Sequence, residues 1–208
     1  MQLRLASFFS AYSYQHLKYR MNFFYISALL LALVTSSVQA ADIYISDPEH
    51  TFVSFSYKHL SYSVQTSRFD RINGIITLND EMDGGIVDVA IETGSVSTGS
   101  DTFNKLLRSE DYFNSEKFPV AKFTSNKIIF NNQAITSIPG ELTIKGITKP
   151  IDIEVSNFAC SRNFITLKYM CGANASAKLS RSEFDLGKYV PFVSDEISLN
   201  IVIEASKE

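Results

Sequence analysis

The chain has 208 residues, with 19 basic and 22 acidic side chains, no tryptophan and two cysteines. Three of the basic residues and none of the acidic ones precede residue 41, so residues 41–208 carry 16 basic and 22 acidic side chains, a net charge of −6. This balance argues against nucleic-acid binding and against electrostatic docking on an anionic membrane. The length of this part suits one domain with a substantial core.

The beginning of the chain has the three-part pattern of a secretory signal peptide. Lys18 and Arg20 precede a short apolar run, Phe23–Val34, and Val38–Ala40 after it forms a small-x-small cleavage site. The run has twelve residues, too few for the roughly 20 that a membrane-spanning helix needs. We therefore expect a leader over residues 1–40 that is removed after Ala40.

Two methionines offer a start for this leader. If Met21 is the true start, residues 1–20 are an artefact of start-site choice. In either case we expect one exported domain over 41–208, located in the periplasm. No second apolar run approaches the length of a membrane span, so we expect a soluble product rather than an integral membrane protein.

The two cysteines, Cys160 and Cys171, both belong to the expected domain. An even number of cysteines in an exported protein favours a disulfide. Two unpaired buried thiols are the alternative. A metal site is disfavoured, because the domain has only two histidines, His50 and His59, and neither is close to a cysteine in the sequence. We expect no metal and no cofactor.

Most of the domain alternates apolar and polar residues with a period of two, which predicts strands with one covered and one wet face. Asp101–Phe113 breaks the pattern with helical spacing, and Asp101 is a candidate N-cap. The predicted class is all-β, an eight-stranded antiparallel barrel with a short helix between strands. The expected strands, with a bulge near Gly74 in the second, lie at 51–59, 68–78, 86–92, 120–130, 141–145, 151–156, 166–179 and 197–204.

An eight-stranded barrel is either packed with side chains or holds one small ligand. Ala173, Ala175 and Ala177 share one strand face with Leu179, so an inward orientation of this face leaves a hollow. The alternative is that phenylalanines from across the barrel cover these alanines. For a hollow barrel, the expected apolar wall consists of Val53, Phe55, Tyr57, Phe69, Val89, Ile91, Leu107, Phe113, Phe123, Leu142, Ile144, Ala175, Ala177, Phe184, Leu199 and Ile201.

No catalytic constellation is present in the sequence. Nucleophile-elbow, dinucleotide-binding, phosphate-binding and zinc-protease motifs are all missing. The adjacent carboxylates Glu110-Asp111 and Asp195-Glu196 point to opposite faces if they lie on strands, so neither pair predicts an acid–base dyad. These observations favour binding over catalysis. A membrane-spanning barrel is disfavoured as well, because the outward positions carry charged and polar residues.

Several stretches, in this order and spacing, resemble the YceI-like family of exported lipid- or polyisoprenoid-binding proteins. The most specific is Leu142–Pro150 (LTIKGITKP), which is similar to the family's L-T-[IL]-x-G-V-T-[KR]-P pattern. The likeness covers essentially all of 42–205. The other matching stretches are Tyr44–Thr51, Tyr57–Leu60, Ser67–Phe69, Leu107–Phe113, Phe118–Ser125, Arg181–Phe184 and Val193–Ile197.

The resemblance implies a lipocalin-like barrel that binds a long apolar ligand, with helices near one opening. It also implies that Cys160 and Cys171 belong to a hairpin, as in one branch of the family. The chain departs from the family pattern at Ser67, where glycine is usual, and at Phe103-Asn104 and Leu106, which make its helix more apolar.

The hypothesis is therefore periplasmic transport or sequestration of a polyisoprenoid, an isoprenoid quinone or a fatty-acid-like ligand. One alternative is an isomerase- or cyclase-type enzyme that acts on a bound lipid, with His59 and Tyr57 as the nearest polar groups. The other is a packed interaction module that docks on a membrane redox partner. A homodimer is a further possibility that the sequence leaves open.

Overall fold

The computed structural model describes residues 41–79, 84–132 and 134–208, and the predicted leader lies outside them. In this part of the chain, twelve strands form one antiparallel sheet. The strands are β1 (Asp42–Ser46), β2 (Phe52–His59), β3 (Ser63–Phe69), β4 (Ile72–Leu78), β5 (Gly85–Glu92), β6 (Val96–Ser97), β7 (Val120–Ser125), β8 (Ile129–Asn131), β9 (Ala134–Ile144), β10 (Ile147–Arg162), β11 (Tyr169–Ser180) and β12 (Glu196–Lys207). The helices are α2 (Asp101–Arg108) and the 3-10 turns η1 (Thr93–Ser95) and η2 (Arg181–Phe184).

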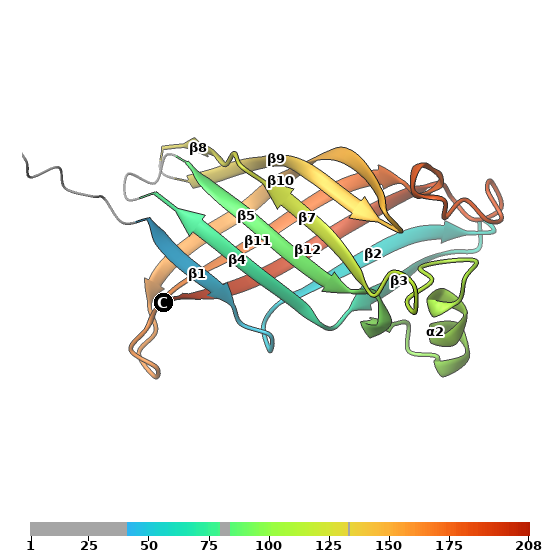
Figure 1. Cartoon of the computed structure of the whole chain (residues 1–208), viewed down its shortest axis with the longest axis horizontal. Helices are drawn as coiled ribbons and strands as arrows, with labels where there is room; N and C mark the ends of the chain where they lie inside the picture. Colours follow the sequence, from blue (N-terminus) through green and yellow to red (C-terminus); the bar gives the residue numbers. More distant parts are fainter. Residues whose placement is uncertain (1–40, 80–83, 133) are drawn as a thin grey trace, which may run out of the picture. The chain divides into compact units, whose positions relative to one another are not determined.

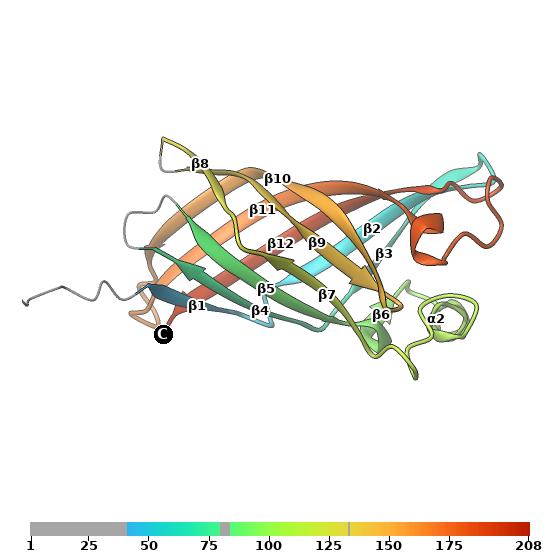
Figure 2. The ribbon, with the colours of Figure 1, turned by 45° about the horizontal axis from the view of Figure 1, so that its top comes forward.

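The sheet closes on itself. Neighbours follow the order β1-β4-β5-β7-β9-β10-β11-β12, and β12 pairs back to β1, so eight strands complete a ring (Figures 1 and 2). At the end that carries α2, β2 takes the place of β1 beside β12, and β3 pairs with β2. The predicted eight-stranded antiparallel barrel with a short helix is confirmed.

The sequence predicts one continuous strand over residues 68–78, and this prediction is wrong. The segment is the end of β3 followed by β4, and the break falls at Asp70 and Arg71. Ser95 stabilises this break, because its carbonyl accepts from the Asp70 amide and its hydroxyl accepts from the Arg71 amide. Gly74 pairs in register with Val89, so the bulge predicted there is absent. The irregular parity that suggested a bulge comes from the break between two strands.

Other boundaries also differ from the sequence prediction. The strand expected at 120–130 is split into β7 and β8, and the strand expected from Thr166 begins at Tyr169. The helix ends at Arg108 instead of Phe113. Its cap is also different, since the hydroxyl of Ser100 accepts the Phe103 amide and Asp101 is already the first helical residue.

Cys160 and Cys171 face each other as direct partners in the β10–β11 pairing and form a disulfide, with Cα atoms 4.0 Å apart. This confirms the predicted bond and rejects the alternative of two free thiols. Met170 and Tyr169 continue the register toward the hairpin loop, while the ladder on the other side shifts between Val155 and Asn157. The disulfide therefore closes the base of the β10–β11 hairpin loop.

Candidate functional site in the barrel interior

The barrel interior contains a cavity of about 270 Å³ at the end that carries α2. Inward positions of β2, β3, β9, β11 and β12 form its wall, and α2 with the segments after α2 and η2 covers its opening. It is lined by Phe55, Tyr57, His59, Phe69, Phe103, Leu106, Leu107, Tyr112, Phe113, Ile144, Leu179, Arg181, Leu186, Lys188, Tyr189, Val193, Ile197 and Leu199. We call it the first cavity.

Three phenylalanines form the side of the first cavity that faces the helix segment. The ring of Phe55 lies 5.4 Å from that of Phe69 and 6.1 Å from that of Phe113, and the Phe69 and Phe113 rings are 5.2 Å apart, edge to face. Such edge-to-face pairs add to the stabilisation from area burial. Because Phe113 follows α2 and the other two belong to the sheet, this cluster fixes the helical segment on the barrel wall.

Polar groups are few and lie toward the opening of the first cavity. Burial raises the pKa of Tyr57 and of Tyr112 above the usual phenol value, so both hydroxyls stay protonated at neutral pH. Lys188 forms an ion pair with Asp111, and this hydrogen bond raises the pKa of Lys188. The other polar side chains of the lining are Tyr189, the exposed His59 at the end of β2 and the buried Arg181. The polar groups therefore surround an apolar interior.

Arg181 organises the chain that borders this opening. Its side chain is buried, and its guanidinium donates to four backbone carbonyls, those of Leu186, Lys188, Val193 and Ser194. Burial lowers the pKa of Arg181 below its ordinary value, but the group remains charged at neutral pH. Arg181 thus holds the irregular segment from 186 to 194 at four carbonyls, and backbone hydrogen bonds of Phe192 and Ser194 to the end of β2 hold it as well.

A second contact fixes the same end of the barrel. The ammonium of Lys145, in the β9–β10 turn, lies 2.7 Å from the carboxylate of Asp185 and donates to the Asp185 carbonyl at 3.0 Å. The Lys145 side chain is buried and the Asp185 carboxylate is exposed. The pair joins the turn within the Leu142–Pro150 stretch to Asp185, the residue that follows η2.

A second cavity of about 110 Å³ lies at the other end of the barrel. Its lining is apolar apart from the hydroxyl of Tyr44, and it includes Ala173 and Ala175 beside Phe123 and Phe158. The alanine face therefore points inward and borders a hollow. The other lining residues are Ile76, Leu78, Val87, Val89, Ile128, Ile135, Ile138, Ile153, Val155, Cys171, Gly172, Ile201, Ile203 and Ala205.

A layer of inward side chains separates the two cavities. On β12, Leu199 lines the first cavity and Ile201, the next inward residue, lines the second. On β11, the buried Ala177 lies between Leu179 of the first cavity and Ala175 of the second. Successive inward residues of a strand are about 6.6 Å apart, so the cavities are neighbours along the barrel.

The structure distributes the sixteen predicted wall residues over these features. Seven line the first cavity, namely Phe55, Tyr57, Phe69, Leu107, Phe113, Ile144 and Leu199. Four line the second, namely Val89, Phe123, Ala175 and Ile201. The remaining five border neither cavity. Val53, Leu142, Ala177 and Phe184 are buried, and Ile91 is half-buried and packs against both core clusters.

Sequence reasoning did not include the chain around the opening of the first cavity. Leu186, Lys188, Tyr189 and Val193 lie in irregular backbone after η2 and have no strand or helix period. Their signals in the sequence are two family-like stretches, one that contains Arg181, whose guanidinium contacts this segment, and one that begins at Val193. Leu106 and Tyr112 were within the predicted helical segment but were not assigned to the wall.

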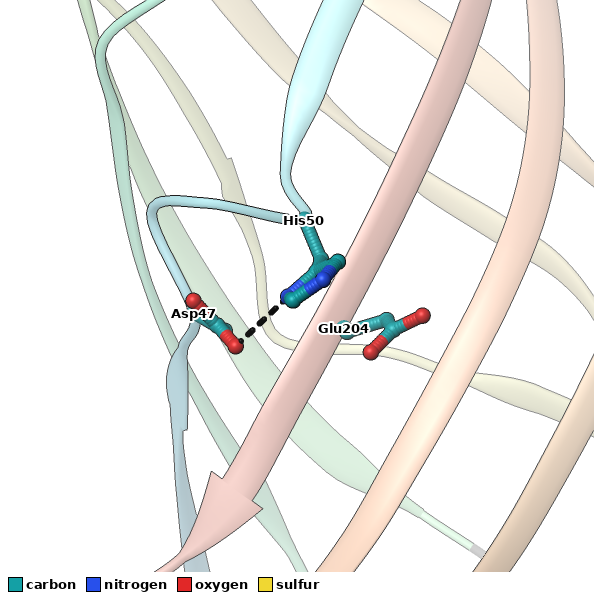
Figure 3. Close-up of side chains that lie close together, drawn as sticks. All are labelled: Asp47, His50 and Glu204. Carbon is teal, nitrogen blue, oxygen red and sulfur yellow. Dashed lines mark hydrogen bonds and ion pairs between the residues drawn. The ribbon is translucent and has the colours of Figure 1, made fainter.

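A polar cluster lies outside the barrel at the corner between β1 and β2 (Figure 3). The Nδ1 atom of exposed His50 is 2.9 Å from the carboxylate of Asp47, and Glu204 on β12 is close to both. The hydrogen bond with Asp47 raises the pKa of His50, and the same bond lowers the pKa of Asp47. The Asp47 amide also donates to the Glu204 carbonyl at 2.7 Å, so the cluster ties this corner to β12.

The geometry defines a closed antiparallel barrel with an apolar interior and a helical cover at one end. The family model described as YceI-like domain matches residues 44–205. The chain belongs to this family. A UPF0312 protein of Photorhabdus laumondii is 32% identical over 185 residues, which cover 88% of this chain and 95% of the relative.

Solved structures share the fold. The YceI protein of Campylobacter jejuni matches with a TM-score of 0.63 and 28% identity, over 73% of this chain and 90% of that one. A structure described as a polyisoprenoid binding domain from Saccharophagus degradans, implicated in plant cell wall breakdown, matches with a TM-score of 0.59 and 16% identity. That match covers 79% of this chain and 98% of the other. Within the described residues, no helix has the length and apolar character needed to cross a membrane.

Proposed function

We propose that this protein binds a long apolar molecule inside the barrel and carries or sequesters it in the periplasm. The candidates are a polyisoprenoid, an isoprenoid quinone and a fatty-acyl lipid. The observation that carries the proposal is the pair of neighbouring apolar cavities along the barrel interior. The Saccharophagus degradans domain is described as polyisoprenoid binding, and the shared fold supports a related ligand here.

The binding energy in this proposal comes from burial. Each methylene group removed from water contributes about 0.8 kcal/mol, so an apolar chain gains affinity with its length and needs no catalytic group. The volume of the first cavity, about 270 Å³, is near the lower end of the range typical of small-molecule pockets. A longer chain would have to pass the layer at Ala177 and Leu142 and enter the second cavity.

The two alternatives receive less support. A packed interaction module does not require cavities, and an enzyme acting on the lipid would require a reactive polar group within them. The two phenols nearest the interior, Tyr57 and Tyr112, have raised pKa values, so neither is activated as a base. His59, the other group of the enzyme hypothesis, borders the first cavity but is exposed at the end of β2. We therefore propose a binding protein and not an enzyme.

The test is native mass spectrometry and lipid extraction of protein purified from its export compartment. We expect one lipid per barrel and, after delipidation, uptake of a prenol or a fatty acid. The matched variants are Ala177→Leu, which enlarges an inward side chain between the cavities, and Ser176→Leu on the outward face of the same strand. Ala177→Leu should lower long-chain uptake at least tenfold and Ser176→Leu should not. A lipid-free barrel that takes up none of these ligands would refute the proposal.

A further inference from the structure

The loop of the β10–β11 hairpin exposes apolar side chains to an unusual degree. Phe164 and Ile165 are 94% and 92% exposed, and Leu167 is 65% exposed. They belong to the segment from Arg162 to Tyr169, which we call the hairpin tip. In Figure 1 the tip extends past the C-terminus, at the end of the barrel away from α2. Three exposed apolar side chains within four residues require a reason, since water contact is unfavourable for each.

Five backbone amides of the hairpin tip, those of residues 163 and 165–168, donate hydrogen bonds within the tip. The side-chain oxygen of Asn163 accepts the amides of Ile165 at 2.8 Å and Thr166 at 3.0 Å. The Leu167 amide donates to the Asn163 carbonyl, and the Asn163 amide donates to the Lys168 carbonyl. In water, solvent can satisfy the backbone amides of a loop. In an apolar medium an unpaired amide is costly, so internal hydrogen bonds of this kind favour entry into such a medium.

The positive charges around the hairpin tip favour contact with an anionic surface. Arg162 and Lys168 flank the apolar residues, and no acidic residue occurs between positions 155 and 182. The Nε atom of Arg162 donates to the Leu167 carbonyl at 3.1 Å, which holds the guanidinium beside the tip. The net charge of −6 outside the leader argues against membrane docking of the whole domain, but this local region is basic and apolar.

We propose that the hairpin tip inserts into the interfacial region of a phospholipid bilayer that contains anionic lipids. Phe164, Ile165 and Leu167 would enter the acyl boundary, while Arg162 and Lys168 would contact lipid phosphates. A bilayer suits this shape better than a protein partner, because stable protein interfaces bury about 800 Å² per partner and the tip is a narrow projection. The Cys160–Cys171 disulfide at its base supports the projection.

This contact would have a consequence for the barrel interior. The second cavity lies next to the hairpin tip. Its lining includes Phe158 on β10, before the tip, and Cys171 and Gly172 on β11, after it. Insertion would therefore hold that end of the barrel against the membrane. The proposal goes beyond lipid binding in the barrel and does not depend on what the cavities hold.

Since the chain contains no tryptophan, a single introduced tryptophan reports on one position. We expect the emission of a Phe164→Trp variant to shift to the blue with vesicles of phosphatidylglycerol and phosphatidylcholine, and to be quenched by brominated acyl chains. A Tyr62→Trp variant is the matched control, because Tyr62 is 86% exposed in the β2–β3 hairpin at the α2 end. Unchanged Phe164→Trp emission, or a response only at Tyr62→Trp, would overturn the proposal.

Vesicle flotation provides the second measurement. Phe164→Ser/Ile165→Ser should weaken vesicle binding about tenfold or more, and Arg162→Gln/Lys168→Gln should weaken it about fivefold for each charge lost when phosphatidylglycerol is present. Tyr62→Ser/Val64→Ser should bind as the wild type does. Wild-type protein that does not float with vesicles, or tip variants that float equally well, would reject the proposal.

Lipid content separates this proposal from the proposed function. The Phe164→Ser/Ile165→Ser variant should still carry lipid in native mass spectrometry if the barrel binds one. A lipid-free barrel whose hairpin tip still binds vesicles would refute the proposed function alone. A lipid-loaded barrel that does not bind vesicles would refute the hairpin-tip proposal alone.

Discussion

Cys160 on β10 and Cys171 on β11 are direct cross-strand partners, and their disulfide closes the base of a hairpin loop whose apolar residues face solvent. The bond separates a long, well-paired ladder from the hairpin tip. Hairpin pairing alone could hold the strands together, but the end of a ladder frays more readily than its middle. The disulfide therefore keeps the exposed tip in one shape.

The first prediction concerns this disulfide. Cys160→Ser/Cys171→Ser should lower the free energy of unfolding by about 3 kcal/mol, because the freed loop of about a dozen residues regains entropy in the unfolded chain. Urea denaturation followed by circular dichroism measures the change. Reduced wild-type protein is the control and should match the double variant. An unchanged denaturation midpoint would show that the disulfide adds nothing to the stability that strand pairing already provides.

The second prediction concerns the layer between the cavities. Leu142→Ala should enlarge the passage between them and cost about 2–5 kcal/mol of stability, as for other buried leucines. The ratio of affinities for a long prenol (solanesol) and a short one (farnesol) should rise, since the longer chain gains access to the second cavity. Competitive displacement of a fluorescent fatty acid measures both affinities.

The control for Leu142→Ala is Glu141→Ala, the adjacent residue, which is exposed. It should change neither affinity. If Leu142→Ala binds both prenols with the wild-type ratio, the cavities do not act together in ligand binding, and the length preference must have another origin.

The inward face of β11 could be predicted from sequence because a period of two assigns faces without tertiary information. The pattern puts Ala173 and Ala175 on one face but leaves open whether they border a hollow or lie under phenylalanines, and in the structure they line the second cavity. Ala177 belongs to the same face but lies between the cavities. The difference depends on which residues of other strands, such as Leu142 on β9, lie at the same height in the barrel, and one strand's pattern does not contain that information.

The opening of the first cavity could not be predicted for another reason. Residues 186–194 have no repeating backbone geometry. The contacts that place them include hydrogen bonds from one buried guanidinium to four carbonyls and backbone hydrogen bonds to the end of β2. Backbone carbonyls have no residue signature. Arg181 was visible in the sequence only as part of a family-like stretch, while Phe184 was assigned to the wall and proves to be buried outside both cavities.

The third prediction concerns Arg181. Arg181→Leu should lower the free energy of unfolding by about 3 kcal/mol, because four carbonyls lose a charged donor. Binding of a fluorescent fatty acid should weaken as well, since Leu186 and Val193 at the opening lose their fixed positions. Thermal denaturation and a binding titration measure the two effects.

Arg181→Lys is the matched control variant for Arg181→Leu. It keeps the charge but lacks the planar fork of donors, so it should restore less than half of the lost stability. Full restoration by lysine would mean that charge, and not the fork geometry, holds this segment. Wild-type ligand affinity in Arg181→Leu would show that the opening does not depend on the segment's order.

The last prediction is a pH dependence at the corner between β1 and β2. The hydrogen bond that the Nδ1 atom of His50 donates to the Asp47 carboxylate, together with the carboxylate charge, raises the pKa of His50 above its ordinary value of 6.5 in the folded state. A raised folded pKa means that the stabilisation is fully present below pH 6.5 and is lost as the pH rises through the folded value. His50→Gln should therefore lower the melting temperature relative to the wild type at pH 5.5, and the difference should vanish at pH 9.

The matched control for this corner is Asp47→Asn, alone and combined with His50→Gln. The carboxylate of Asp47, whose pKa the same hydrogen bond lowers, is ionised at pH 5.5, so Asp47→Asn should remove the same pH-dependent stability. Because both groups act through one contact, the double variant should be no less stable at pH 5.5 than the less stable single variant. A His50→Gln effect that grows from pH 5.5 to pH 9 would contradict the sign of this linkage, and additive single effects would show that His50 acts mainly through Glu204.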